Sequence, residues 1–142
     1  GKDALIDGKM GEFVWDGKWQ GFEGTDFEVV VEADSVSEHS MLVLRTLSKK
    51  SAWVYWPTEV VLSGSSDGIH FVEIERQSGA IQNYQDDDGV KQFQFSLKSG
   101  ETTKDRRMRY FKLSAHSIKK LPQDHPFVGE KSWLFIDEIL LR

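Results

Sequence analysis

Hydrophobic and polar residues alternate along most of this chain in short runs, and clusters of Gly, Ser, Asp and Lys separate the runs. A period of two in runs rich in Val, Ile, Phe and Tyr is typical of strands with one buried face. The alternation is clearest where Phe93, Phe95 and Leu97 fall on one face and polar residues on the other. The pattern predicts strands near residues 27–34, 40–48, 58–65, 69–77, 90–98, 108–116 and 133–142.

No stretch shows three turns of helical periodicity, so the pattern predicts an all-β protein with about eight strands in a sandwich or barrel. Asp67 and Gly68 lie between two predicted strands. Because Gly tolerates positive φ, we expect a type I′ or related hairpin turn there. The chain of 142 residues has the length of one domain, which we place at residues 1–142.

Composition narrows the class of protein. Hydrophobic residues make up 39% and charged residues 29% of the chain, as in a folded domain. The net charge of −5 disfavours nucleic acid as a partner, and the apolar runs are too short to span a bilayer. The absence of Cys excludes disulfides and thiol chemistry. The chain begins with Gly1 and has no recognisable signal peptide, so we expect a domain excised from a larger enzyme.

Aromatic residues are concentrated in the predicted loops. Segment 8–26 holds Trp15 and Trp19, and segment 49–57 holds Trp53 and Trp56, whereas Trp133 opens the last predicted strand and is expected in the core. An indole ring can stack on the apolar C–H face of a pyranose while neighbouring side chains bond its hydroxyls. The loop aromatics therefore indicate a sugar site. The alternative is that these rings close the ends of the sandwich.

Nothing in the sequence marks a catalytic centre. The four His residues lack the spacing of a metal-binding helix, and the GxSxG, Walker A, GxGxxG and HExxH motifs are absent. The facing carboxylates of a glycosidase cannot be recognised in a linear sequence, and nothing marks such a pair. We therefore expect a domain without catalytic residues. The run from Asp86 to Asp88 is interpreted as a solvated loop tip rather than a metal site.

Carboxylates also stand near both ends of the chain. Asp7 lies in a Gly turn near the start, and Glu138 lies in the last predicted strand. Oxygens from a turn and a terminal strand would suit Ca²⁺, which takes six to eight oxygen ligands. The alternative is that Asp7 caps its own turn and Glu138 faces solvent.

Several motifs, in order along the chain, resemble the coagulation factor 5/8 type C or discoidin family. The resemblance extends from about Ala4 to Leu141. It is closest to the accessory modules at the C-terminal end of bacterial β-N-acetylhexosaminidases and related glycoside hydrolases. The segments that resemble the family are LIDG at 5–8, WQGFEGTD at 19–26, SAWVYWPTEV at 51–60, SDGIHF at 66–71, RYFKL at 109–113 and HPFVGEKSWLFIDEI at 125–139.

The resemblance implies an eight-stranded, galactose-binding-like jelly-roll sandwich with its binding loops at one end and a structural Ca²⁺ beside them. Asp7 and Glu138 match the positions of carboxylate ligands, and the carbonyls of Ala4, Lys9 and Glu12 are further candidates. The His, Arg or Asn and aromatic trio of galactose-binding relatives is not found at matching spacings. Our candidate sugar-binding residues come from the loops: Trp15, Trp19, Gln20, Trp53, Arg107, His125 and Lys131.

The resemblance and the loop aromatics together predict a non-catalytic carbohydrate-binding module. The module would hold a secreted bacterial glycoside hydrolase on terminal galactose or N-acetylhexosamine residues of a glycan, outside the cell, in the periplasm or on the outer surface. We expect a monomer. One alternative is a structural domain that only packs on its catalytic neighbour. Another is adhesion to protein or lipid through apolar loop tips at Trp53, Val54, Tyr55 and Trp56.

Overall fold

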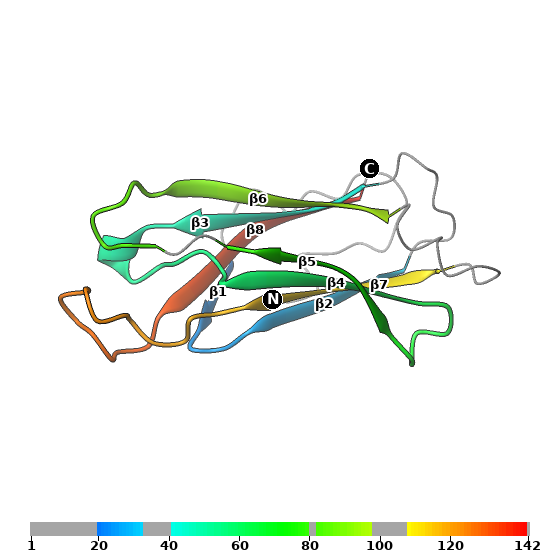
Figure 1. Ribbon diagram of the computed structural model, residues 1–142, viewed down its shortest axis with the longest axis horizontal. Helices are drawn as coiled ribbons and strands as arrows, with labels where there is room; N and C mark the ends of the chain where they lie inside the picture. Colours follow the sequence, from blue (N-terminus) through cyan, green and yellow to red (C-terminus); the bar gives the residue numbers. More distant parts are fainter. Residues whose placement is uncertain (1–19, 33–40, 80–81, 98–107, 142) are drawn as a thin grey trace.

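Two four-stranded antiparallel sheets lie one over the other in the computed structural model, which describes residues 20–32, 41–79, 82–97 and 108–141 (Figure 1). The all-β sandwich predicted from the sequence is confirmed. The first sheet has the order β1-β8-β3-β6 and the second has the order β2-β7-β4-β5. The strands are β1 (Gln20–Glu23), β2 (Phe27–Glu32), β3 (Met41–Ser48), β4 (Glu59–Ser65), β5 (Val72–Ser78), β6 (Gly89–Ser96), β7 (Tyr110–His116) and β8 (Trp133–Leu141).

Each strand pairs with the strand that stands equally far from the opposite end of the chain. The first strand pairs with the last, β2 pairs with β7, β3 with β6 and β4 with β5, all antiparallel. Two further pairs, β3 with β8 and β4 with β7, complete the sheets. This winding brings the odd-to-even connections β3–β4, β5–β6 and β7–β8 to one end of the sandwich (Figure 1).

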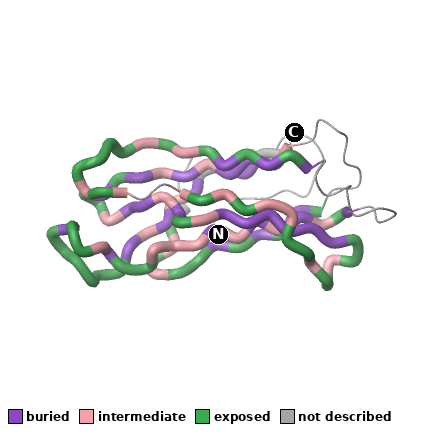
Figure 2. Tube along the Cα trace, viewed as in Figure 1, coloured by how far each residue is buried: buried purple, intermediate pink, exposed green. Residues whose placement is uncertain are grey.

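The core lies between the sheets, where alternate residues of each strand point inward. Phe27, Val29 and Val31 of β2 are buried and their neighbours are exposed. In β6, Phe93 and Phe95 are buried while the polar residues between them face solvent, as the alternation predicted. Buried residues therefore follow the strands, and exposed residues dominate the connections (Figure 2).

Trp133 differs from its predicted place in the core. Leu134 and Ile136 of β8 point inward and are buried, so Trp133 and Phe135 take the opposite, outer face, where both are partly exposed. The two rings meet edge to face with centroids 5.9 Å apart. They lie over Gly21 of β1, where a Cβ atom would come within 2.7 Å of the Phe135 ring.

The connection between β4 and β5 also differs from the prediction. It spans Ser66 to Phe71 instead of a two-residue turn, and Gly68 has φ +78° whereas Asp67 does not have positive φ. A type I′ turn needs positive φ at both central residues, so that assignment is wrong. The wider connection is stabilised by the Asp67 side chain. In the described part of the chain, no helix has the length and apolar character to cross a membrane.

Candidate functional site at the loop end

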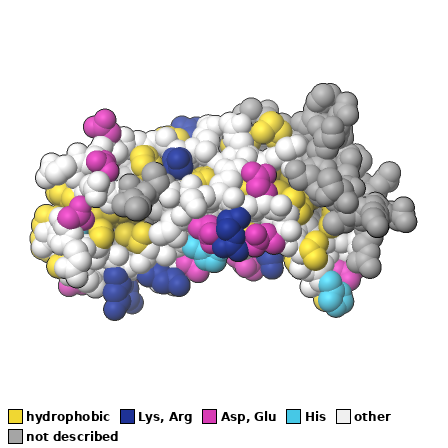
Figure 3. Space-filling view, viewed as in Figure 1, with side chains coloured by type: hydrophobic (Ala, Val, Ile, Leu, Met, Phe, Trp, Pro, Cys, Tyr) yellow, Lys and Arg dark blue, Asp and Glu magenta, His cyan; other side chains and the backbone are white. Residues whose placement is uncertain are grey.

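Four connections form one end of the sandwich, which we call the loop end: residues 49–58 between β3 and β4, 82–88 before β6, 117–132 between β7 and β8, and 24–26 between β1 and β2. The β3–β4 connection begins with a single 3-10 turn, η2 (Lys50–Ala52). On the face drawn in Figure 3, hydrophobic side chains gather at this end.

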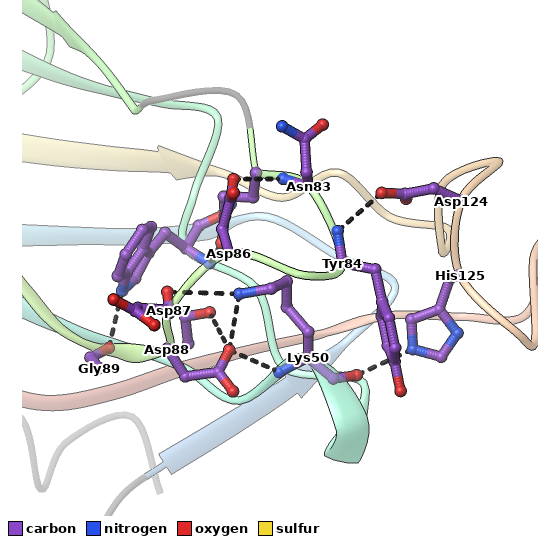
Figure 4. Close-up of polar contacts among 12 residues, drawn as sticks. Lys50, Asn83, Tyr84, Asp86, Asp87, Asp88, Gly89, Asp124 and His125 are labelled. Carbon is purple, nitrogen blue, oxygen red and sulfur yellow. Dashed lines mark hydrogen bonds and ion pairs between the residues drawn. The ribbon is translucent and has the colours of Figure 1, made fainter.

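A buried lysine joins the first two connections (Figure 4). The side chain of Lys50 is 1% exposed, and its Nζ atom donates to Asp88 Oδ1 at 2.7 Å. The same carboxylate oxygen accepts from the Lys50 backbone N–H at 3.0 Å and from Ser48 Oγ at 3.1 Å. The Lys50 ammonium also donates to the carbonyl of Asp87 at 3.4 Å. A buried ammonium needs such partners because desolvation strongly disfavours an unpaired charge.

The acidic run is therefore only partly the solvated tip expected from the sequence. Asp86, Asp87 and Asp88 are exposed as residues, but the Asp88 carboxylate is occupied by Lys50. Burial acts to raise the pKa of Asp88, yet the hydrogen bonds from Lys50 and Ser48 outweigh it, so this pKa lies below its ordinary value of 3.8. Among the described residues, no group of three His, Cys, Asp or Glu side chains is arranged to hold a metal ion.

The third connection is fixed by His125, whose ring is buried. The Phe127 backbone N–H donates to His125 Nδ1 at 2.9 Å, so Nδ1 has no proton and Nε2 donates to the Lys50 carbonyl at 2.8 Å. The Tyr84 ring packs edge to face on the imidazole at 4.8 Å, and the Tyr84 N–H donates to Asp124 at 2.7 Å. Both nitrogens of His125 thus serve the scaffold, and its role is to position neighbouring groups.

Above this scaffold lies a pair of aromatic rings, Trp53 and Phe127, with centroids 5.6 Å apart at 42°. The Phe127 side chain is 58% exposed, and the adjacent Val128 is 47% exposed. Trp53 has φ +69°, a left-handed conformation that is strained for a bulky residue. Its N–H donates to the Lys50 carbonyl at 3.0 Å and its carbonyl accepts from Trp133 at 2.8 Å, so the backbone that presents the ring is fixed.

The apolar loop tip considered for adhesion is smaller than the sequence suggested. Val54 and Tyr55 are buried, so they cannot act as exposed apolar contacts. Trp56 is partly exposed, but its Nε1 donates to the Gly89 carbonyl at 2.9 Å, which directs its ring across the loop. The Tyr55 hydroxyl has no hydrogen-bond partner among the described residues, and burial raises the pKa of Tyr55 to about 12, with nearby acidic groups adding to the rise.

Of the sugar-binding candidates, Trp53 and His125 come together at the loop end, where both rings lie near Phe127. Lys131 is exposed in the same connection as His125, but its side chain lies against Gly24 in the β1–β2 connection. Gln20 begins β1, where its backbone pairs with Ile136. Glu138 lies opposite Arg45 in the register of β8 and β3. The remaining candidates lie outside the described residues: Trp15, Trp19 and Arg107 for the sugar, and Asp7, Ala4, Lys9 and Glu12 for the metal.

Sequence reasoning missed Phe127, Tyr84, Lys50 and Asp88 as members of this site. The signal for Phe127 was its place in the loop segment 117–132 beside His125, but a single Phe gave no reason to expect an exposed ring. A scan against models of known protein families finds no match for this chain, and a search of curated proteins finds none.

Proposed function

We propose that this domain is a non-catalytic carbohydrate-binding module, and that the loop-end pair of Trp53 and Phe127 stacks on a sugar ring. One observation carries the proposal: the exposed ring of Phe127 rests against the Trp53 ring, whose backbone hydrogen-bonds to Lys50 in its own connection and to Trp133 of β8. Rigid aromatic surface presented at low entropic cost is suited to the apolar face of a pyranose.

The wider biological setting rests on the discoidin resemblance. The pairing of first strand with last, second with seventh, and so on supports the jelly-roll description, because it is the pattern of one long hairpin folded over itself. We propose terminal galactose or N-acetylhexosamine as the ligand and a secreted bacterial glycoside hydrolase as the parent enzyme. A module of this kind raises the local concentration of its enzyme on the glycan without chemistry of its own.

A second candidate is a structural domain, favoured by the same exposed side chains. Phe127 and Val128 form an apolar tip that would also suit burial against a neighbouring domain. In the intact enzyme, this reading requires the tip to be shielded, whereas sugar binding requires it to face solvent. Hydrogen exchange of the loop-end amides, compared between the isolated domain and the whole enzyme, separates the two.

The test of sugar binding is titration of the domain with galactose, N-acetylgalactosamine and N-acetylglucosamine, followed by Trp fluorescence and calorimetry. Phe127→Ala should weaken binding about fivefold or more, since stacking on an aromatic ring contributes on the order of 1–3 kcal/mol. Ile69→Ala is the matched control, because Ile69 is 75% exposed at the other end of the sandwich. No binding at millimolar sugar, or equal losses in the two variants, would contradict the proposal.

Ca²⁺ remains part of the proposal only through the family resemblance. The described backbone includes one candidate ligand position, Glu138 in β8, and among the described residues no group of three His, Cys, Asp or Glu side chains is arranged to hold a metal ion. We derive no step of recognition from the ion. Thermal melts with chelator and after calcium is added back should show a shift by mass action if the ion binds the folded state.

A further inference from the structure

The connection from β4 to β5 lies at the end of the sandwich opposite the loop end (Figure 1). Residues of this connection and of the adjoining strands line a pocket of about 320 Å³. Its lining combines apolar and polar side chains: Val72 and Met108, with Ser66, Asp67 and His70. This volume is at the lower end of the range for small-molecule sites, which pair an apolar surface with a few fixed polar groups. Neither the loop-end site nor the discoidin resemblance accounts for it.

The polar wall of the pocket is fixed by hydrogen bonds. Asp67 Oδ1 accepts from Ser65 Oγ at 2.8 Å and from the backbone amides of Ile69 and His70 at 2.8 and 2.9 Å. Asp67 Oδ2 lies 2.8 Å from His70 Nδ1. The hydrogen bond from His70, followed by those from the amides and from Ser65, holds the pKa of Asp67 well below its usual range. The carboxylate is therefore ionised and fully occupied.

The ionised carboxylate determines which nitrogen of His70 is free. Because Asp67 Oδ2 can only accept, Nδ1 must donate to it, and the ring is thereby oriented with Nε2 on the side away from Asp67. Among the described residues, neither His70 Nε2 nor the Ser66 hydroxyl has a hydrogen-bond partner. The pocket thus offers an oriented imidazole nitrogen and a hydroxyl beside an apolar surface.

We propose that this pocket binds a small, neutral, polyhydroxylated molecule such as a monosaccharide or the terminal sugar of a glycan. One ligand hydroxyl hydrogen-bonds to His70 Nε2, a second exchanges a hydrogen bond with Ser66, and the C–H face of the ring rests on Val72 and Met108. An anionic ligand fits poorly, since no Lys or Arg of the described residues lines the pocket and Asp67 is charged. A metal ion fits poorly as well, because the pocket offers one imidazole and no second free nitrogen or carboxylate.

This site is separate from the loop-end site, and either can fail without the other. If both bind, the domain is bivalent, with sugar sites at opposite ends of the sandwich. Two weak sites on one rigid body raise avidity for a dense glycan surface through effective concentration. With two sites, the domain would attach to the glycan through both ends of the sandwich instead of through the loop end alone.

The experiment is a two-dimensional NMR titration of the ¹⁵N-labelled domain with galactose and N-acetylglucosamine, following the amides of Ser66 to His70 and the His70 ring protons. His70→Asn removes Nε2 while keeping a donor for Asp67, and Ser66→Ala removes only the hydroxyl. Ile69→Ala is the neighbouring control, because Ile69 does not line the pocket. Phe127→Ala reports on the loop-end site in the same spectra.

We expect saturable shifts at the pocket that weaken about tenfold in His70→Asn or Ser66→Ala and persist in Ile69→Ala and Phe127→Ala. That result supports the pocket even where the loop end shows no shift. Three results overturn it: no saturable shift at the pocket at millimolar sugar, unchanged affinity in both pocket variants, or loss of the pocket shifts in Phe127→Ala. Sugar shifts confined to the loop end would leave the proposed function intact and reject the pocket alone.

Discussion

Lys50 and Asp88 form one ion pair, but removing Asp88 should lower the free energy of unfolding more than removing Lys50. Lys50 is almost fully buried, whereas the side chain of Asp88 is 41% exposed. Asp88→Ala leaves a buried ammonium with only the Asp87 carbonyl as partner, at 3.4 Å. Lys50→Met removes the charge, keeps most of the packing, and leaves a carboxylate that water can reach. We therefore expect Asp88→Ala to be the more destabilising of the two.

The magnitude follows from burial. Breaking a buried ion pair by removing one partner costs about 3–5 kcal/mol. Because Asp88 is more than one-third exposed, solvent screens the pair and water can enter once the carboxylate is removed, so we expect about 2–3 kcal/mol for Asp88→Ala. Lys50→Met should cost about 1 kcal/mol, mainly through lost hydrogen bonds. The double variant should cost less than the sum, since the ammonium left unpaired by Asp88→Ala is absent from it.

Urea unfolding followed by Trp fluorescence measures the four free energies of this double-mutant cycle. Asp87→Ala is the control, because it removes the neighbouring carboxylate, which makes no hydrogen bond or ion pair among the described residues. We expect it to change stability by less than about 0.5 kcal/mol. If Lys50→Met costs as much as Asp88→Ala, or if the coupling energy is below about 0.5 kcal/mol, the pair does not stabilise the loop end as argued.

Three further predictions concern acid stability, a glycine and a buried hydroxyl. The pKa of Asp88 is lowered in the folded state, so its carboxylate stabilises the fold above about pH 4, and this stabilisation is lost as the pH falls further. The Asp88→Asn variant should not show this loss of stability in urea melts at about pH 2–5. Gly21→Ala should cost about 1–3 kcal/mol in the same assay, because the new methyl group meets the Phe135 ring. Tyr55→Phe should raise Tm or leave it unchanged, since the removed hydroxyl is buried without a partner; a clear drop would reveal a hidden partner.

Most of the fold was predictable because a strand with one buried face alternates hydrophobic and polar residues. The seven predicted strands correspond to β2 through β8, with limits that differ by a few residues. Strand β1 was missed, because four residues that include Gly21 are too few to show alternation. Trp133 was misplaced for a related reason: periodicity separates two faces of a strand, but it does not say that a large aromatic residue must take the inner one.

Part of the candidate site could be proposed from the sequence, because Trp53 and His125 both belong to predicted loop segments and both lie near Phe127 at the loop end. That these residues bind a sugar stays a prediction. The sequence contained no sign that Lys50 is buried, because its partner Asp88 is 38 residues away and a Lys-Lys pair ordinarily lies on the surface. The tautomer of His125 likewise depends on contacts with Lys50 and Phe127 that only the fold brings together. Long-range polar pairing is the part of the site that a local pattern does not encode.

Hydrogen bonds within the loops account for part of the excess of acidic residues in this chain. Several aspartates at the ends of the sandwich accept hydrogen bonds from loop amides: Asp26 from Ser117, Asp67 from Ile69 and His70, Asp86 from Asn83, Asp88 from Lys50, and Asp124 from Tyr84. Part of the net charge of −5 thus stabilises connections and is not evidence for a cationic ligand. Loops fixed in this way would lose little entropy if a ligand binds to them, whatever the chemistry of the contact.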